Sequence, residues 1–393
     1  MKIALINFFF AYNYGAVLQC TALKTVLEKM GHKVDIINYR PYYQMQYYNK
    51  YPNPLKSAGV AWEKYDYMPP LKRAVLSAKW SLHTLKDIKN RKNKKMLKKC
   101  FGTYIDKNFN LTNLYSTYNE LKNNPPQGYD VYVSGSDQLW NPDVTWGVDP
   151  AYYLNFGTKN TKRIAYAISP CGLDFDIYSE KVKEVALGLD FISLRESEKQ
   201  QQLSLLLKRN DIHICPDPTL LLMENDYKKY EDKIDIEKDS YIFFYGFSDR
   251  QKDNNIIQYV QKAGKKNNLK ILDASLDEFK WNDKENVIKK VLNPGEFLTA
   301  IKSAKMIITN SFHGTVFSII YRKNFMTFTK TGTASRMVEL LENLHLKDRI
   351  IDNYNDIKDD YTDYTDIEKN LKLYTEKAYD YFSMAGLYRE NEI

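Results

Sequence analysis

Several common functional signatures are missing from this 393-residue chain. Its four cysteines (Cys20, Cys100, Cys171 and Cys215) show neither CxxC pairs nor metal-ligand spacing, so we expect free thiols in a reducing compartment. The five histidines form no ligand spacing either, so no metal site is expected. No HExxH, Walker or GxSxG motif is present, which leaves the zinc protease, P-loop and hydrolase classes without support.

Long apolar runs are also absent, since none reaches the length that crosses a bilayer. Residues 2–8 are mostly apolar but include Asn7, and they lead directly into a turn with Gly15. This pattern favours a first β-strand over a signal peptide. A hydrophobic fraction of 44% with 13 Pro and 16 Gly is typical of a globular chain. We therefore expect a soluble, cytoplasmic protein of two domains.

Positive charge is concentrated in one segment. Residues 71–100 hold eleven Lys and Arg and a single acid, Asp87, so this segment carries +10 and the remainder −2. The segment also has an apolar stripe at helical spacing, formed by Leu71, Val75, Ala78, Leu82, Leu85 and Ile88, which Leu76 and Trp80 widen. Three interpretations remain open: a solvated face over a packed stripe, a contact with anionic membrane, and an RNA contact. No aromatic and glycine RNA motif accompanies the charge, so the membrane ranks above RNA and no nucleic acid is expected.

The rest of the chain alternates between strand and helix patterns. Residues 2–8, 16–30 and 33–39 predict a βαβ unit whose first turn lies over the carboxyl edge of the sheet. It contains no GxGxxG, and no acid ends the second strand, so a NAD site is not expected. Further strands are predicted at 129–133, 163–169, 191–195, 241–247, 269–273, 305–309 and 325–329.

This order predicts an α/β protein with two Rossmann-like domains facing a cleft. We place the N-terminal domain at 1–223, with a Tyr-rich and basic helical insertion at 41–127. A charged connection at 224–239 leads to the C-terminal domain at 240–350. The final residues, 351–393, form an acidic linker and a crossover helix. Tyrosines of the insertion could stack on sugars or simply pack.

Polar residues gather after the predicted strands of both domains. They are Asn13, Gly15, Ser136, Asp137, Gln138 and Arg195 in the first domain, and Ser311, His313, Gly314 and Arg336 in the second. In the stretch 305–316 a strand turns into a helix start that carries Ser and His. Such a start offers N–H groups to an anion, next to an imidazole that transfers protons near neutral pH. A capped helix with a core-edge histidine would give the same pattern. Two arginines would suit a small dianion with phosphate and carboxylate groups.

Five motifs, in order, resemble the polysaccharide pyruvyl transferase family over roughly residues 1–350. They are NYGAVLQCTALKTVLEKMGHKVDIINYRP, VSGSDQLWNP, SLRESE, CPDPTLLL and NSFHGTVFSII, of which GSDQLWN and NSFHG are the most specific. The resemblance implies a GT-B-like fold and transfer of the pyruvyl group of phosphoenolpyruvate onto two sugar hydroxyls, giving a cyclic ketal. The acceptor would be a cell-surface polysaccharide or its lipid-linked precursor, and no cofactor is implied.

The resemblance also assigns roles to residues. His313 matches the family's histidine near the donor and would be the general acid, and Arg195 matches the arginine that holds phosphoenolpyruvate. Arg336, Ser311 and Gly314 would complete the donor side, while Asn13, Gly15, Ser136, Asp137 and Gln138 are assigned to the cleft, on the acceptor side. Asn324, where proline is expected, and His345, where Leu-Gly-Leu is usual, depart from the pattern away from this chemistry. A nucleotide-sugar glycosyltransferase and a non-catalytic carbohydrate-binding or assembly protein of the same fold are the alternatives.

Overall fold

The computed structural model describes most of the chain and divides it into two units. The described residues are 1–48, 53, 55, 58, 69–86, 91–158, 160–249, 251–329, 334–351, 353–354, 357–358 and 361–388. Unit 1 contains residues 1–12, 19–215 and 381–393, and unit 2 contains residues 13–18 and 216–380. The chain thus enters unit 2 just after Cys215, ahead of the connection predicted at 224–239, and the first turn of helix α1 belongs to unit 2.

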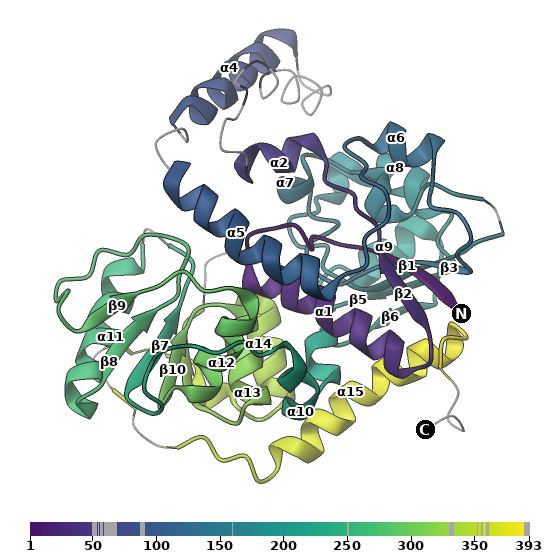
Figure 1. The fold of residues 1–393 in the computed structure, drawn as a ribbon. Helices are drawn as coiled ribbons and strands as arrows, with labels where there is room; N and C mark the ends of the chain where they lie inside the picture. The colour runs from purple at the N-terminus through teal and green to yellow at the C-terminus, as the bar shows by residue number, and fades with distance from the viewer. Residues whose placement is uncertain are drawn as a thin grey trace. The chain divides into compact units, whose positions relative to one another are not determined.

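Unit 1 is built on a fully parallel six-stranded sheet (Figure 1). Its order is β2-β1-β3-β4-β5-β6, a doubly wound order that reverses between β1 and β3. The strands are β1 Lys2–Ile6, β2 Lys33–Ile36, β3 Val131–Ser134, β4 Lys162–Ile168, β5 Phe191–Leu194 and β6 Ile212–Ile214. Sequence reasoning missed β6, which has only three residues and no run of apolar side chains.

Helices alternate with the strands of unit 1, and several short ones among them were not predicted. The helices are α1 Tyr14–Lys29 (its first turn in unit 2), α2 Tyr42–Tyr48, α4 Pro70–Lys86, α5 Arg91–Asn108, α6 Tyr118–Asn123, α7 Pro142–Thr145, α8 Phe175–Ala186 and α9 Gln200–Leu207, with a 3₁₀ turn at Pro150–Tyr153. Within the segment 71–100, for which a helix was expected, the described residues belong to α4 and to the first part of α5, and residues 87–90 lie outside the described residues. Residues 49–68, in the Tyr-rich part of the insertion, are mostly outside the described residues.

Unit 2 repeats the architecture with a five-stranded parallel sheet. Its order is β11-β10-β7-β8-β9, which reverses between β7 and β10. The strands are β7 Tyr241–Tyr245, β8 Lys270–Asp273, β9 Val287–Lys289, β10 Met306–Thr309 and β11 Asn324–Thr327. The helices are α10 Glu224–Tyr227, α11 Asp253–Asn267, α12 Pro294–Ser303, α13 Phe312–Ile320, α14 Ala334–Asn343 and most of α15 Ile367–Met384, with 3₁₀ turns at Pro218–Leu221 (η3), Lys228–Tyr230 and Lys347–Arg349. The edge strand β9 was not predicted.

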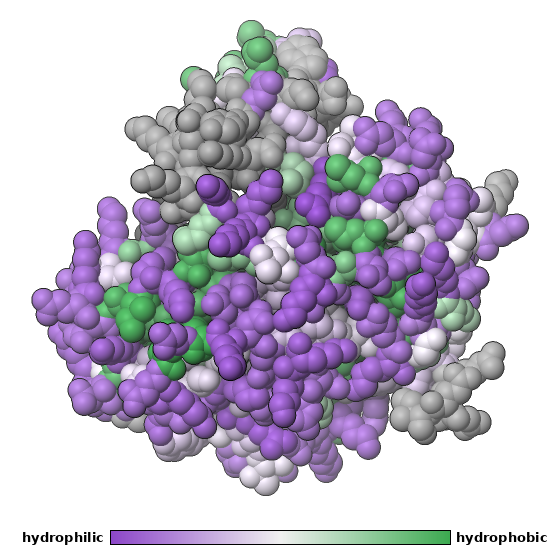
Figure 2. Space-filling model, in the orientation of Figure 1, coloured by the Kyte–Doolittle hydropathy of each residue, from purple (hydrophilic) through white to green (hydrophobic). Residues whose placement is uncertain are grey.

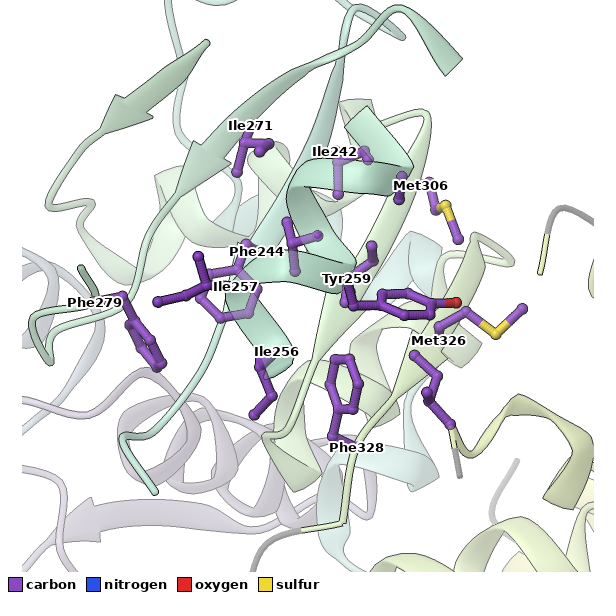
Figure 3. Packing of buried hydrophobic residues seen from close by; sticks show 14 of the residues in the cluster. Ile242, Phe244, Ile256, Ile257, Tyr259, Ile271, Phe279, Met306, Met326 and Phe328 are labelled. Carbon is purple, nitrogen blue, oxygen red and sulfur yellow. The ribbon is translucent and has the colours of Figure 1, made fainter. Parts of the chain in front are cut away.

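Alternation along β7 explains why helices cover both faces of this sheet. Ile242 and Phe244 pack into a cluster with Ile256, Ile257 and Val260 of α11, which recur at helical spacing (Figure 3). Phe243 points the other way and meets the ring of Phe297 on α12, with ring centroids 5.4 Å apart. Successive side chains of a strand face opposite sides, so a continuous run of buried residues requires cover on both sides.

The C-terminal helix α15 crosses from unit 2 into unit 1, as expected. Within unit 1, Tyr381 donates a hydrogen bond to the carbonyl of Ala165 on β4 at 2.9 Å, and Phe382 stacks on Tyr166 at 4.6 Å. No helix among the described residues combines the length and apolar character needed to cross a bilayer. The two Rossmann-like parallel sheets confirm the predicted α/β class.

Candidate functional site

His313 lies in the first turn of α13, at the carboxyl end of β10. Ser311 is the N-cap, with its side chain accepting a hydrogen bond from the amide of Gly314 at 3.3 Å. The helix begins at Phe312, directly after this cap, so its start carries Ser and His as the sequence predicted. Since β10 borders the point where the strand order reverses, the turn lies where α/β sheets commonly bind ligands.

Two close contacts fix the turn before His313. Thr309 accepts a hydrogen bond from the Ser311 amide at 3.0 Å, and a Cβ on Gly314 would lie 2.4 Å from the Thr309 hydroxyl oxygen. Asn310 exchanges two hydrogen bonds of 2.7 Å with the backbone of Phe247 after β7. Gly314 is therefore needed for a close approach, and Asn310 ties β10 to β7 across the point of reversal.

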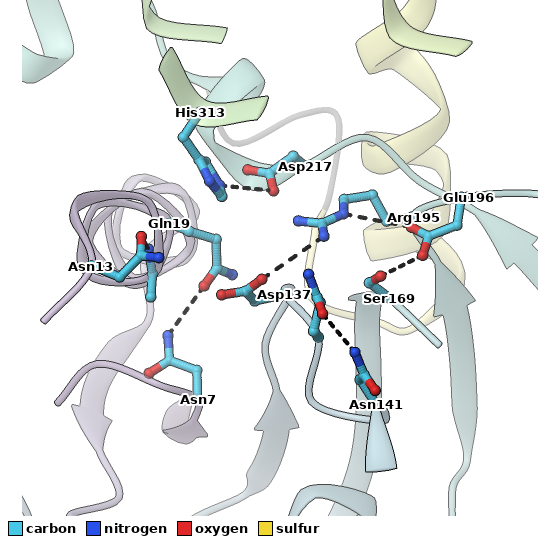
Figure 4. A network of polar contacts seen from close by, with 12 residues as sticks. Asn7, Asn13, Gln19, Asp137, Asn141, Ser169, Arg195, Glu196, Asp217 and His313 are labelled. Atoms are coloured by element: carbon cyan, nitrogen blue, oxygen red, sulfur yellow. Dashed lines mark hydrogen bonds and ion pairs between the residues drawn. The ribbon is translucent and has the colours of Figure 1, made fainter. Parts of the chain in front are cut away.

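The imidazole of His313 is held between a carboxylate and a glycine. Its Nε2 lies 3.4 Å from Oδ2 of Asp217, whose side chain is completely buried (Figure 4). The other carboxylate oxygen, Oδ1, accepts hydrogen bonds from the amide and hydroxyl of Thr219, at 3.0 and 2.6 Å. These bonds orient the carboxylate, and so they also orient the ring.

Gly15 covers the opposite side of the ring. A Cβ built on Gly15 would lie 2.1 Å from Nδ1 of His313, so no other residue fits there without moving the imidazole. The first turn of α1 is anchored in unit 2 by Tyr14, which stacks on Phe297 at 4.3 Å and accepts a hydrogen bond from the Leu292 amide at 3.1 Å. Asn13 caps the helix by accepting from the Ala16 amide at 3.3 Å. Of the predicted residues, Asn13 and Gly15 thus belong with His313.

Arg336 lies on the same unit, at the start of α14. Its guanidinium is 5.6 Å from the centroid of the Phe312 ring, which adjoins His313 in sequence. Unit 2 therefore brings together one imidazole, one guanidinium and a capped helix start. This set can bind an anion and transfer a proton.

A second polar cluster surrounds Arg195 at the carboxyl ends of β3, β4 and β5 in unit 1. Arg195 has a buried guanidinium between two carboxylates, 3.9 Å from Asp137 Oδ1 and 3.6 Å from Glu196 Oε2 (Figure 4). Glu196 also accepts a hydrogen bond from the Ser169 hydroxyl. The carboxylates neutralise the buried cation, and burial without such partners would be costly.

The GSDQLWN segment forms the other side of this cluster. Asp137 has φ +89°, a backbone conformation that residues with side chains rarely adopt, and such strain is typical of functional turns. Its carbonyl accepts from the amide of Ser169 at 2.9 Å. Gln138 accepts a hydrogen bond from Asn141 at 2.7 Å, and Ser136 is fully buried. Asp137 therefore adjoins Arg195, while Gln138 contacts Asn141 within the same loop.

Asp217, Glu196 and Ser169 were missed as site residues by sequence reasoning. Asp217 is preceded and followed by proline in the CPDPTLLL motif, which predicted only a rigid turn. Its Oδ1 does cap the 3₁₀ turn η3, and only the fold shows that Oδ2 reaches His313. Of the insertion's tyrosines that the structure describes, Tyr43 donates a hydrogen bond to the buried Asp149 at 2.5 Å. Tyr39, just before the insertion, donates to the same carboxylate at 2.8 Å.

No group of three or more His, Cys, Asp or Glu side chains among the described residues is arranged to hold a metal ion. In unit 2, the start of α13, the His313 imidazole and Arg336 provide cationic and proton-transferring groups. This chemistry suits an anionic substrate that must be protonated.

Comparison with protein families gives one match, to the model described as Polysaccharide pyruvyl transferase, over residues 13–329. No curated protein matches the chain. Solved structures match across nearly the whole chain at low similarity. A UDP-N-acetylglucosamine 2-epimerase from Rickettsia bellii is 9% identical, with 98% of this chain and 96% of that chain covered and a TM-score of 0.45.

Two other matches are similar in quality. A putative UDP-N-acetylglucosamine 2-epimerase from Listeria monocytogenes is 10% identical, covering 98% of this chain and 89% of that chain with a TM-score of 0.41. The E. coli heptosyltransferase WaaC is 11% identical, covering 84% and 88% with a TM-score of 0.35. Likeness at this level carries no argument about binding or activity, so the family match is the informative one.

Proposed function

Because the chain belongs to the polysaccharide pyruvyl transferase family, we propose that it transfers the pyruvyl group of phosphoenolpyruvate onto two hydroxyls of a sugar. The product is a pyruvate ketal on a polysaccharide or on its lipid-linked precursor, made at the cytoplasmic face of the membrane. The family match over residues 13–329 carries this proposal. The pairing of His313 with Asp217 adds a proton-transfer group that the reaction needs.

The reaction requires one proton at the start and releases phosphate. Protonation of C3 of the enol makes C2 electrophilic, and one sugar hydroxyl adds to C2 and loses its proton. The C2–O bond to phosphate then breaks, and the second hydroxyl adds to C2 and gives its proton to the departing phosphate, which closes the ketal. Phosphoenolpyruvate and a diol thus give the ketal and inorganic phosphate, with no oxidant and no further reactant.

We assign the first proton transfer to Nδ1 of His313. Nε2 is shielded from solvent and faces the Asp217 carboxylate, so Asp217 fixes the orientation of the ring. Gly15 packs against the edge of the ring that carries Nδ1, where any side chain would collide with the imidazole. Arg336 and the start of α13 are proposed to bind the phosphate or carboxylate of the donor.

Arg195 is proposed to bind phosphoenolpyruvate in the same reaction. Its guanidinium is held by Asp137 and Glu196, and a planar fork pairs with a carboxylate or phosphate through two bonds. Ser136 and Gln138 remain proposals for the acceptor side.

The test is phosphate release from phosphoenolpyruvate with a panel of free and lipid-linked sugars. His313→Ala is expected to lower turnover by about 10²–10⁴-fold, as loss of a general acid does, with unfolding unchanged. Calorimetry with phosphoenolpyruvate and with UDP-sugars is the companion measurement. Binding of the nucleotide sugars alone would favour a glycosyltransferase, and no turnover with any sugar would favour a non-catalytic carbohydrate-binding protein.

A further inference from the structure

Helix α4 presents an apolar stripe to solvent. Leu71, Val75 and Leu82 are 79%, 63% and 60% exposed, and Ala78 is exposed as well. These residues recur at i, i+4, i+7 and i+11, so they share one face of the helix. They belong to the apolar stripe that the sequence predicted, but other residues of α4 make its packing contacts.

The helix is held by its opposite side. Ser77 is buried, and Trp80 is partly buried, with its ring centroid 4.1 Å from that of Trp146 in the loop after α7. At about 100° per residue, Trp80 points about 180° away from Leu71. The exposed stripe is therefore not what attaches α4 to unit 1.

Lysines border the exposed stripe. Lys72 and Lys79 are both exposed, and both lie about 80–100° from Leu71 around the helix, along the same edge of the stripe. Lys95, Lys98 and Lys99 of α5 are exposed too. Figure 2 shows hydrophobic side chains beside hydrophilic ones on the surface around α4.

We propose that α4 is an interfacial helix that binds the surface of a membrane containing anionic lipid. An apolar face bordered by Lys is what such helices present, the apolar side chains entering the acyl boundary and the ammonium groups meeting the headgroups. At 17 residues, α4 is about 25 Å long and carries Lys, so it lies along the surface.

Charge decides between this partner and the alternatives. A second copy of the chain would bring its own α4, and the +10 of residues 71–100 would repel the same charge. Anionic headgroups satisfy both the Lys edge and the apolar face, whereas RNA would leave the apolar face uncovered. The inference goes beyond the proposed function, because lipid binding is measured without any turnover.

The experiment is co-sedimentation of the full chain with vesicles of phosphatidylcholine alone or mixed with phosphatidylglycerol. We expect binding to the mixed vesicles only, and release by high salt. Leu71→Ser/Val75→Ser/Leu82→Ser should abolish binding, and Lys72→Glu/Lys79→Glu should weaken it at least tenfold, since each Lys near an anionic surface contributes several-fold.

Matched controls come from exposed positions elsewhere. Leu205→Ser on α9, where Leu205 is 72% exposed, controls for the loss of a surface leucine. Lys238→Glu/Lys265→Glu, at side chains 75% and 72% exposed, controls for charge. Both should bind as the unmodified chain does, and circular dichroism should show every variant folded.

Four results would overturn the proposal. Equal binding to neutral and anionic vesicles would remove the charge argument. Undiminished binding of the α4 variants would place any lipid contact elsewhere. Self-association without lipid that the serine variant abolishes, or RNA binding that the glutamate variant abolishes, would assign α4 to a second copy or to RNA.

Discussion

Gly15→Ala tests whether the position of the His313 ring matters for the reaction. The added Cβ would lie 2.1 Å from Nδ1, and real Cβ contacts stay beyond 3.0 Å, so the imidazole must shift by about 1 Å or more. A displacement of that size at a reacting group can cost about 10²-fold in rate. Overpacking costs about 1–3 kcal/mol of stability, which a domain of ordinary stability survives.

The assay compares kcat for phosphate release and the free energy of unfolding. Gly102→Ala is the matched control, because Gly102 lies within helix α5 with nothing within 4 Å of its Cβ position. It should keep full activity and gain a little stability, since Ala is the better helix former. Gly15→Ala should lose about 10²-fold in kcat while remaining folded.

A double variant separates the clash from other effects. With Ala at position 313 the ring is gone, so Gly15→Ala should cost almost nothing in stability in that background. It should also cause no further loss of activity. Full activity of Gly15→Ala, or the same stability cost with and without the ring, would refute the assignment of Gly15 as the residue that positions His313.

Three further outcomes follow from the structure. Asp217→Asn keeps the shape of the side chain and removes its charge. We therefore expect kcat to fall about a hundredfold or more, with KM for phosphoenolpyruvate little changed. If kcat and the pH profile are unchanged, Asp217 serves only to cap the 3₁₀ turn η3. Arg195→Lys should raise KM for the donor about tenfold, because an ammonium cannot reproduce the fork, and an unchanged KM would make Arg195 structural. Burial raises the pKa of the Cys20 thiol to about 12 from the ordinary 9.0, so the unfolded chain ionises first. The free energy of unfolding should therefore fall by up to about 1.4 kcal/mol per pH unit above pH 9, but not below it. Denaturation at pH 8 and pH 10 checks this, and an equal fall in Cys20→Ala would contradict it.

The sequence predicted the central strands and the helices between them, because buried parallel strands are apolar runs and amphipathic helices repeat at 3.6 residues. The strands β6 and β9 were not predicted because each has only three residues at a sheet edge, too few to show a recognisable pattern. Helix α4 shows a different limit. Periodicity indicates which residues share a face, but whether Leu71 and Val75 are covered depends on the fold.

The sequence predicted several residues of the candidate site, but not the contacts between them. Ser311, His313 and Gly314 were found because a helix start after a buried strand has a recognisable pattern. Asp217 was not, because it lies 96 positions before His313 and its local context already explains it as a cap. The role of Gly15 was not predicted either. A glycine in a turn is commonly needed because its own backbone adopts a conformation that other residues avoid, whereas Gly15 is needed because the ring of His313 leaves no space for a side chain.

Both sheets place their polar loops beside the point where the strand order reverses. In unit 1 the GSDQLWN segment follows β3, and in unit 2 the NSFHG segment follows β10, each next to the strand at the reversal. Helices leave such neighbouring strands in opposite directions, which opens a crevice at the carboxyl edge. The two most specific motifs of the sequence thus occupy equivalent positions in two separate sheets, and the fold requires neither of them there. A capped helix alone would need Ser311 but neither a buried Asp217 against His313 nor a glycine against its ring. These two contacts favour a chemical role for His313 over a purely structural one.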